Sequence, residues 1–140
     1  MKRYLGLDLG SRTLGVALSE SGIIAHALDT HRFPDGAYGD AIDIIISLID
    51  AHDINVVVLG YPKHMNNDVG IRGKISESVR EGILTLRPIE VVLWDERLST
   101  QTAIKTMVKA DQSRKTQKQK KDALAAVIIL QNYLDYQSRT

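Results

Sequence analysis

Acidic residues occur at three points where the sequence is otherwise apolar. Asp8 interrupts the run LGLDLG, Asp95 and Glu96 follow the run EVVLW, and Asp122 opens the run DALAAVIIL. A buried carboxylate is costly unless donors, a cation or a function offset its burial. Grouped carboxylates without His or Cys suit Mg²⁺ or Mn²⁺. Two such ions about 4 Å apart can activate a water and stabilise the leaving oxygen of a phosphodiester.

Each of these acids also has a purely structural explanation. Asp122 can be the N-cap of a helix, and Asp8 can accept backbone N–H groups of the turn that follows it. Asp95 or Glu96 can pair with Arg97 or with a lysine. The metal hypothesis is favoured because all three acidic points can fall at one edge of a sheet.

The hydrophobic pattern predicts the elements that must bring these acids together. Short apolar runs predict strands, and apolar residues at helical spacing predict helices. Ser99 or Thr100 can cap a helix within 97–110, and polar loops are expected over 62–73 and 111–121. The expected strands are 3–8, 13–20, 22–31, 55–61 and 89–96, and the other expected helices are 40–52, 75–86 and 122–136.

The order of these elements predicts an α/β fold. The first three strands fit an antiparallel meander, and the later alternation of helix and strand fits parallel pairing through crossovers. We therefore expect a mixed five-stranded sheet, a three-strand antiparallel meander plus two parallel strands, flanked by helices. Asp8 should lie near the end of a central strand, although periodicity leaves the strand order open.

Length and composition suit a single domain spanning 1–140. Hydrophobic residues make up 44% of the chain and charged residues 25%, as in ordinary globular proteins. There are no cysteines, which excludes disulfides and thiolate chemistry. The N-terminus lacks the apolar core of a signal peptide, and no apolar run approaches the ~20 residues that span a bilayer. We therefore expect a cytoplasmic protein without a membrane partner.

Positive charge is concentrated in one segment. Residues 105–121 hold seven Lys or Arg and one acid, Asp111, so this segment carries +6 in a chain whose net charge is +1. A basic segment on an otherwise acidic chain is typical of a surface that binds a polyanion. It is equally compatible with a solvated loop and helix face.

Four stretches resemble the YqgF (RuvX) family: GLDLGSRTLGVALS, VVVLGYP, VVLWDERLST and KKDALAAVIILQNYLD. The resemblance runs from about Tyr4 to Asp135. Members of this bacterial family are described as Holliday junction resolvases and as nucleases that mature the 5′ end of pre-16S rRNA. The sequence departs from the family pattern after Gly60, at Tyr61 and at 66–68. The resemblance therefore does not define the details of this loop or its contacts with substrate.

The resemblance implies an RNase H-like nuclease domain whose catalytic, metal-binding positions are Asp8, Glu96 and Asp122. Asp8 and Asp122 would bind one Mg²⁺ or Mn²⁺, and Glu96 would help to position a second ion or the attacking water. The first motif contributes Arg12 and the DER motif contributes Arg97. The residues expected to contact nucleic acid are Arg12, Arg97, Lys109, Arg114, Lys115, Lys118, Lys120 and Lys121.

The favoured function is metal-dependent hydrolysis of structured RNA in 5′-end processing of pre-16S rRNA, by a monomer and with ribosomal precursor particles as a further partner. The alternative is resolution of four-way DNA junctions, which cuts two symmetric strands and calls for a dimer. A non-catalytic nucleic-acid-binding scaffold is a third hypothesis. An actin-like ATPase shares the strand–Asp–turn–strand opening, but it needs two domains and a second Gly-rich motif.

Overall fold

The computed structural model describes residues 1–61, 69–95 and 123–138. The predicted helix within 97–110 and the polar segment 111–121 lie outside these residues. The described strands are β1 (Tyr4–Leu9), β2 (Thr13–Ser19), β3 (His26–Arg32), β4 (Val56–Tyr61) and β5 (Glu90–Asp95). The described helices are α1 (Tyr38–His52), α2 (Val69–Leu86) and α5 (Leu124–Ser138).

The strands form the predicted mixed sheet, in the order β3-β2-β1-β4-β5. β1 pairs antiparallel with β2, and β2 pairs antiparallel with β3. β4 pairs parallel with β1 on its other side, and β5 pairs parallel with β4. The meander and the parallel pair therefore share β1, which becomes the central strand.

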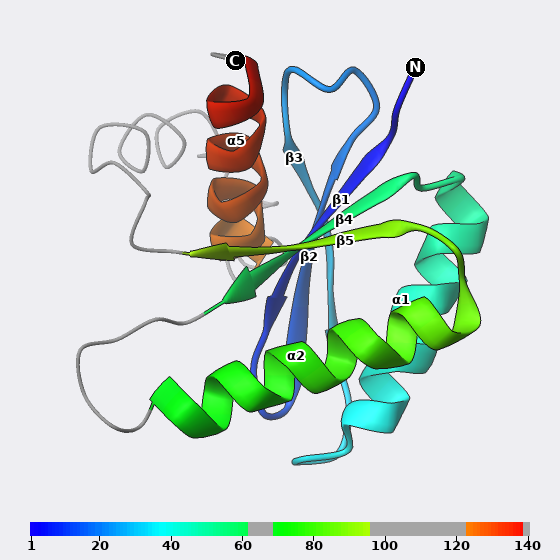
Figure 1. Cartoon of the computed structure of the whole chain (residues 1–140), viewed down its shortest axis with the longest axis vertical. Helices are drawn as coiled ribbons and strands as arrows, with labels where there is room; N and C mark the ends of the chain where they lie inside the picture. The colour runs from blue at the N-terminus through cyan, green and yellow to red at the C-terminus, as the bar shows by residue number, and fades with distance from the viewer. Residues whose placement is uncertain (62–68, 96–122, 139–140) are drawn as a thin grey trace.

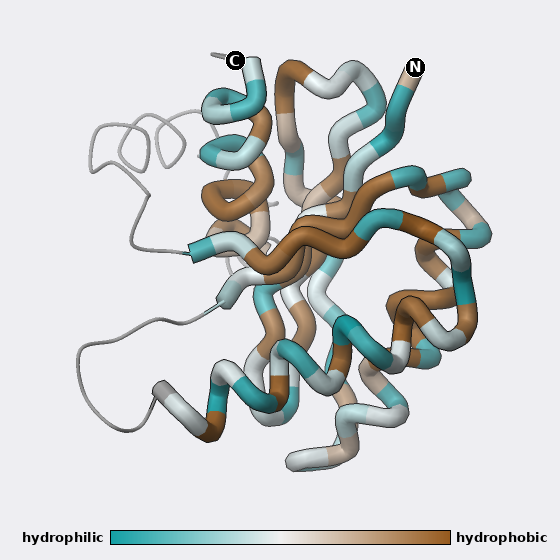
Figure 2. Tube along the Cα trace, viewed as in Figure 1, coloured by the Kyte–Doolittle hydropathy of each residue, from teal (hydrophilic) through white to brown (hydrophobic). Residues whose placement is uncertain are grey.

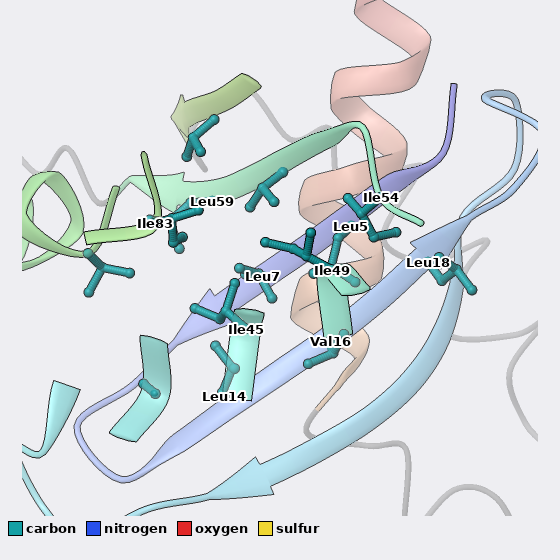
Figure 3. Packing of buried hydrophobic residues seen from close by; sticks show 14 of the residues in the cluster. Leu5, Leu7, Leu14, Val16, Leu18, Ile45, Ile49, Ile54, Leu59 and Ile83 are labelled. Carbon is teal, nitrogen blue, oxygen red and sulfur yellow. The ribbon is translucent and has the colours of Figure 1, made fainter. Parts of the chain in front are cut away.

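Helices cover both faces of the sheet, because successive side chains of a strand point to opposite faces. Figure 1 shows α1 and α2 on one face and α5 on the other. Figure 3 shows Leu5 and Leu7 of β1 packed with Ile45 and Ile49 of α1. The alternate residues of the strands, such as Val58, join the buried face of α5 in a second cluster.

β4 carries a continuous apolar signal, and its tube is largely brown in Figure 2, whereas α5 is brown over its N-terminal turns and teal or pale toward its C-terminus. β4 is buried on both faces, as its continuous run of valines predicts. α5 has buried side chains on several sides, again as predicted: Ala126, Val127, Ile129, Leu130, Tyr133 and Leu134. In the described part of the chain no helix has the length and apolarity to cross a bilayer.

Two predicted boundaries and one predicted burial were wrong. β3 begins at His26, not at residue 22, because the Ser21 hydroxyl accepts the N–H groups of Ile23 and Ile24 and so holds them in a turn. Ile23 is consequently 70% exposed. α2 begins at Val69, inside the predicted loop 62–73. β5 was expected to be buried, but it is an edge strand with partly exposed residues.

The early start of α2 depends on a close contact with β4. A side chain at Gly73 would bring a Cβ within 3.3 Å of the Tyr61 hydroxyl. The same hydroxyl donates a hydrogen bond to Glu77 Oε1, at 2.8 Å. The absence of a side chain at residue 73 thus lets the first turns of α2 lie against the end of β4, despite the low helix propensity of glycine.

Candidate functional site

Asp8 lies at the carboxyl-terminal end of the central strand, as predicted. It is the penultimate residue of β1 and pairs with Gly15 of β2. On the other side, the parallel register that pairs Leu7 with Leu59 brings Gly60 of β4 beside it. Both lateral neighbours of Asp8 are therefore glycines, which leave open space around its carboxylate.

The Asp8 carboxylate is partly buried and has no hydrogen-bond or ion-pair partner among the described residues. Burial raises its pKa above the usual value of 3.8, and the guanidinium of Arg72 lowers the pKa by a smaller amount. None of the described residues donates a hydrogen bond to this side chain or forms an ion pair with it. The turn after β1 is closed instead by the Gly10 N–H, which bonds to the Thr13 carbonyl at 2.8 Å. The described residues therefore do not support the structural explanation, in which Asp8 accepts N–H groups of the turn that follows it.

A pocket of about 250 Å³ opens beside Asp8. Its walls come from the end of β1 and the turn after it, from Gly60 of β4, from Tyr38 at the start of α1, and from the first turns of α2. The pocket thus lies at the carboxyl ends of β1 and β4, the edge at which open α/β sheets bind ligands. Arg72 and Ser76 of α2 face the pocket together with Asp8.

α5 runs antiparallel to β1 and begins near the Asp8 end of the sheet. At the far end, the Tyr4 hydroxyl lies 3.3 Å from Gln137 Oε1, and the Tyr4 ring is 6.3 Å from that of Tyr133. Gly6 lies against Ala126 and Leu130, and a Cβ there would come within 2.6 Å of Leu130 Cβ. Each step along β1 toward Asp8 therefore leads toward the start of this helix.

Two of the predicted site residues lie in the described part of the chain, Asp8 and Arg12. Arg12 occupies the turn between β1 and β2, and its Nε is 3.8 Å from a carboxylate oxygen of Asp35. Its side chain is 75% exposed, so this loose pair adds little stability and leaves the guanidinium accessible. The predicted site residues outside the described part are Glu96, Arg97, Lys109, Arg114, Lys115, Lys118, Lys120, Lys121 and Asp122.

Asp95, one of the two acids expected to close the fifth strand, is the last residue of β5. The described residues contain no group of three His, Cys, Asp or Glu side chains that could hold a metal ion. Sequence reasoning missed Arg72, because the two glycines around it, Gly70 and Gly73, predicted a loop. It also missed that Asp8 lies between glycines of two neighbouring strands. This can be known only from the strand order, which the sequence leaves open.

The arrangement of sheet and helices is that of the RNase H-like resolvases. Thermus thermophilus RuvC superposes with a TM-score of 0.64 at 12% identity, covering 99% of this chain and 97% of RuvC. The yeast mitochondrial Holliday junction resolvase Ydc2 superposes with a TM-score of 0.51 at 13% identity, covering 99% of this chain and 81% of Ydc2. These similarities define the fold.

Sequence comparison then gives the family. The RuvX family, described as Holliday junction resolvase, matches residues 2–136. A protein of Onion yellows phytoplasma is 50% identical over 134 residues, 94% of this chain and 88% of its own length. A protein of Staphylococcus aureus strain JH9 is 47% identical over 135 residues, 95% of each chain. Both are named "Putative pre-16S rRNA nuclease". The chain belongs to the RuvX (YqgF) family and is a nuclease.

Proposed function

We propose that this protein hydrolyses phosphodiester bonds with Mg²⁺ or Mn²⁺ held by Asp8, Glu96 and Asp122, and that it matures the 5′ end of pre-16S rRNA. The observation that carries the proposal is the partly buried carboxylate of Asp8 in the central strand, which has no partner among the described residues and whose pKa is raised by burial. Burial of such a group is costly, and a bound cation would offset the cost. Carboxylate oxygens are hard ligands, which suit Mg²⁺ or Mn²⁺.

The direction of α5 supports a role for Asp122. Ala126 packs on Gly6, and Asp8 follows Gly6 on the same face of β1. α5 begins at Leu124, near the Asp8 end of β1, and Asp122 precedes Leu124 by two residues in the sequence.

Strand alternation supports Glu96 over Asp95. β4 and β5 pair Gly60 with Trp94, so Trp94 stands level with Asp8. Trp94 belongs to the cluster on the α5 face, whereas Leu93 packs toward the opposite face. Because successive residues of a strand point to opposite faces, Asp95 points away from the face that Trp94 and Asp8 share.

The bound ions would supply Lewis-acid stabilisation of the leaving oxygen and a hydroxide-like nucleophile. The chain itself would contribute the three carboxylates, the space left by Gly15 and Gly60, and the basic residues that hold the phosphate backbone. Of these, Lys109 to Lys121 would make affinity fall with salt. We infer a cytoplasmic monomer acting on ribosomal precursor particles.

The names of the phytoplasma and staphylococcal proteins favour pre-16S rRNA as the substrate. The family description and the resolvase fold favour a second candidate, the four-way DNA junction. The two candidates differ in the oligomer they need, because a junction presents two symmetric strands. A non-catalytic scaffold would bind RNA and cut nothing, and an actin-like ATPase would turn over ATP.

The test is cleavage of a pre-16S rRNA 5′ fragment and of a four-way DNA junction, each with Mg²⁺, with Mn²⁺ and with EDTA. We expect Asp8→Asn, Glu96→Gln and Asp122→Asn each to slow cleavage by about 10²-fold or more, as loss of a catalytic electrostatic group does. Asp43→Asn, at an exposed position of α1, is the matched control and should cut at the wild-type rate. Wild-type rates in all three site variants would refute the assignment.

Depletion in the host separates the two substrates. If pre-16S rRNA is the substrate, depletion leaves 16S precursors with an unprocessed 5′ end. If four-way junctions are the substrate, the rRNA ends stay normal and purified protein resolves junctions as a dimer.

A further inference from the structure

Arg72 lies where a cation can act on the same phosphate as Asp8. It belongs to the first turns of α2 and lines the pocket that Asp8 lines from β1. The guanidinium is close enough to lower the pKa of Asp8. Yet the two side chains do not form an ion pair within the part of the chain that the structure describes. Asp8 and Arg72 therefore line one pocket without forming an ion pair with each other.

Arg72 has no structural role that the described residues reveal. Its side chain is exposed, and among the described residues it makes neither a hydrogen bond nor an ion pair. Arg87 shows the contrast, because its Nε and Nη2 contact both carboxylate oxygens of Asp50 at 2.9 and 2.6 Å. A cation in the first turn of a helix is also disfavoured by the helix dipole. A bound anion would remove that disadvantage.

The remaining walls of the pocket suit one unit of a nucleic-acid backbone. Ser11 and Tyr38 bring hydroxyl groups, and Ile71 and Ile75 bring apolar surface. A volume of about 250 Å³ is slightly smaller than that of ligand pockets for drug-sized molecules, which start at about 300 Å³. The pocket therefore fits a phosphate with its attached sugar better than a stack of bases.

We propose that Arg72 binds the phosphate that is cut, reaching it from α2 while Asp8 approaches from β1. The planar guanidinium can donate two parallel hydrogen bonds to phosphate oxygens and offset the charge that develops on them. The contact is to the backbone, so it acts on RNA and DNA alike. This inference rests on the proposed nuclease function and adds a substrate-binding residue to it.

The experiment compares Arg72→Ala and Arg72→Lys with Lys74→Ala. Lys74 is an exposed cation on the same helix that does not line the pocket, so it controls for loss of charge alone. Cleavage of the rRNA fragment and of the junction is measured at saturating enzyme with Mg²⁺. We expect Arg72→Ala to slow cleavage of both by about 10²-fold, the usual cost of removing one transition-state donor. Arg72→Lys should recover part of the rate, and Lys74→Ala should stay within about twofold of wild type.

A second measurement does not depend on cleavage. Affinity for a labelled single-stranded RNA is measured in EDTA at several salt concentrations. Removing one phosphate contact lowers the slope of log affinity against log salt by about 0.7 on single strands. Arg72→Ala should show this change and Arg72→Lys should not. Because Arg72 is exposed, thermal unfolding of both variants should match wild type.

The outcomes separate the two proposals. If wild type and Arg72→Ala cut at the same rate, or if Lys74→Ala loses as much as Arg72→Ala, the role of Arg72 is refuted and the nuclease function stands. If wild type binds RNA but cuts neither substrate with any metal, the proposed function fails. In that case an unchanged salt slope in Arg72→Ala would also refute the phosphate contact.

Discussion

At the scale of single residues, Asp8 is an acid that the fold destabilises. Burial raises its pKa, so the folded chain binds a proton at Asp8 more tightly than the unfolded chain does. Its contribution to stability therefore falls as pH rises from the unfolded value near 3.8 through the higher folded value, and the loss persists at neutral pH. A catalytic site commonly carries such a cost.

We expect Asp8→Asn to stabilise the protein while it slows cleavage. In EDTA at pH 7, thermal unfolding should shift upward by about 2–4 °C, the change that ~1 kcal/mol gives in a chain of this size. The gain should shrink as the pH approaches 4. A variant that unfolds at a lower temperature than wild type at pH 7 would contradict this account.

Asp50 provides a control, because the fold lowers its pKa, whereas it raises the pKa of Asp8. The hydrogen bond from Arg87 lowers its pKa, so its contribution to stability is present above the unfolded pKa and is lost as pH falls through the folded pKa. Asp50→Asn should therefore unfold slightly below wild type at pH 7, and the difference should disappear in acid. Both partners are exposed, so the effect is small.

At the scale of elements, the contact between β1 and α5 connects folding with the site. A Cβ at Gly6 would lie 2.6 Å from Leu130 Cβ and 2.9 Å from the Ala126 carbonyl oxygen, both of them close to the helix axis. Neither atom can rotate away, so the whole helix must shift. α5 begins next to position 122, so the shift would also disturb the proposed site.

We expect Gly6→Ala to destabilise the protein by about 1–3 kcal/mol, the usual cost of overpacking a core, and to reduce cleavage. Urea unfolding measures the first effect and the nuclease assay the second. Gly82→Ala is the matched control, because its Cβ would meet only the Cδ1 end of the flexible Ile42 side chain, at 2.6 Å. Alanine gains about 1 kcal/mol over glycine in a helix, so this variant should be neutral or more stable. Equal losses in both variants would refute the explanation.

At the scale of the whole molecule, charge is divided between a basic segment and an acidic remainder. Residues 105–121 carry +6, whereas the entire chain carries +1. We predict that this segment supplies most of the salt dependence of binding, because each neutralised phosphate releases counterions.

The test replaces four lysines with glutamine, namely Lys115, Lys118, Lys120 and Lys121. The slope of log affinity against log salt should fall by about 3 for single-stranded RNA if all four contact phosphates. Lys2→Gln is the control, because Lys2 precedes β1 and lies at the opposite edge of the sheet from Asp8. An unchanged slope in the fourfold variant would place the phosphate contacts elsewhere.

Much of the sheet could be predicted because its signals are local. Alternation in β1 and β2, the continuous apolar run of β4 and the apolar first half of α5 follow from a few neighbouring residues. The boundaries of β3 and α2 could not be predicted in the same way. They depend on the Ser21 hydroxyl as a competing acceptor and on the contact between Gly73 and Tyr61, which joins two elements.

The sequence by itself determined the chemical groups and their places on elements: an acid near the end of a strand, two acids after another strand, and an acid before a buried helix. Only the tertiary structure decided that β1 is central, that Gly15 and Gly60 flank Asp8, and that Arg72 faces the same pocket. The physical reason is how far apart along the chain the interacting residues lie. Strand and helix patterns arise from adjacent side chains, whereas strand order and the pocket depend on which distant surfaces bury each other.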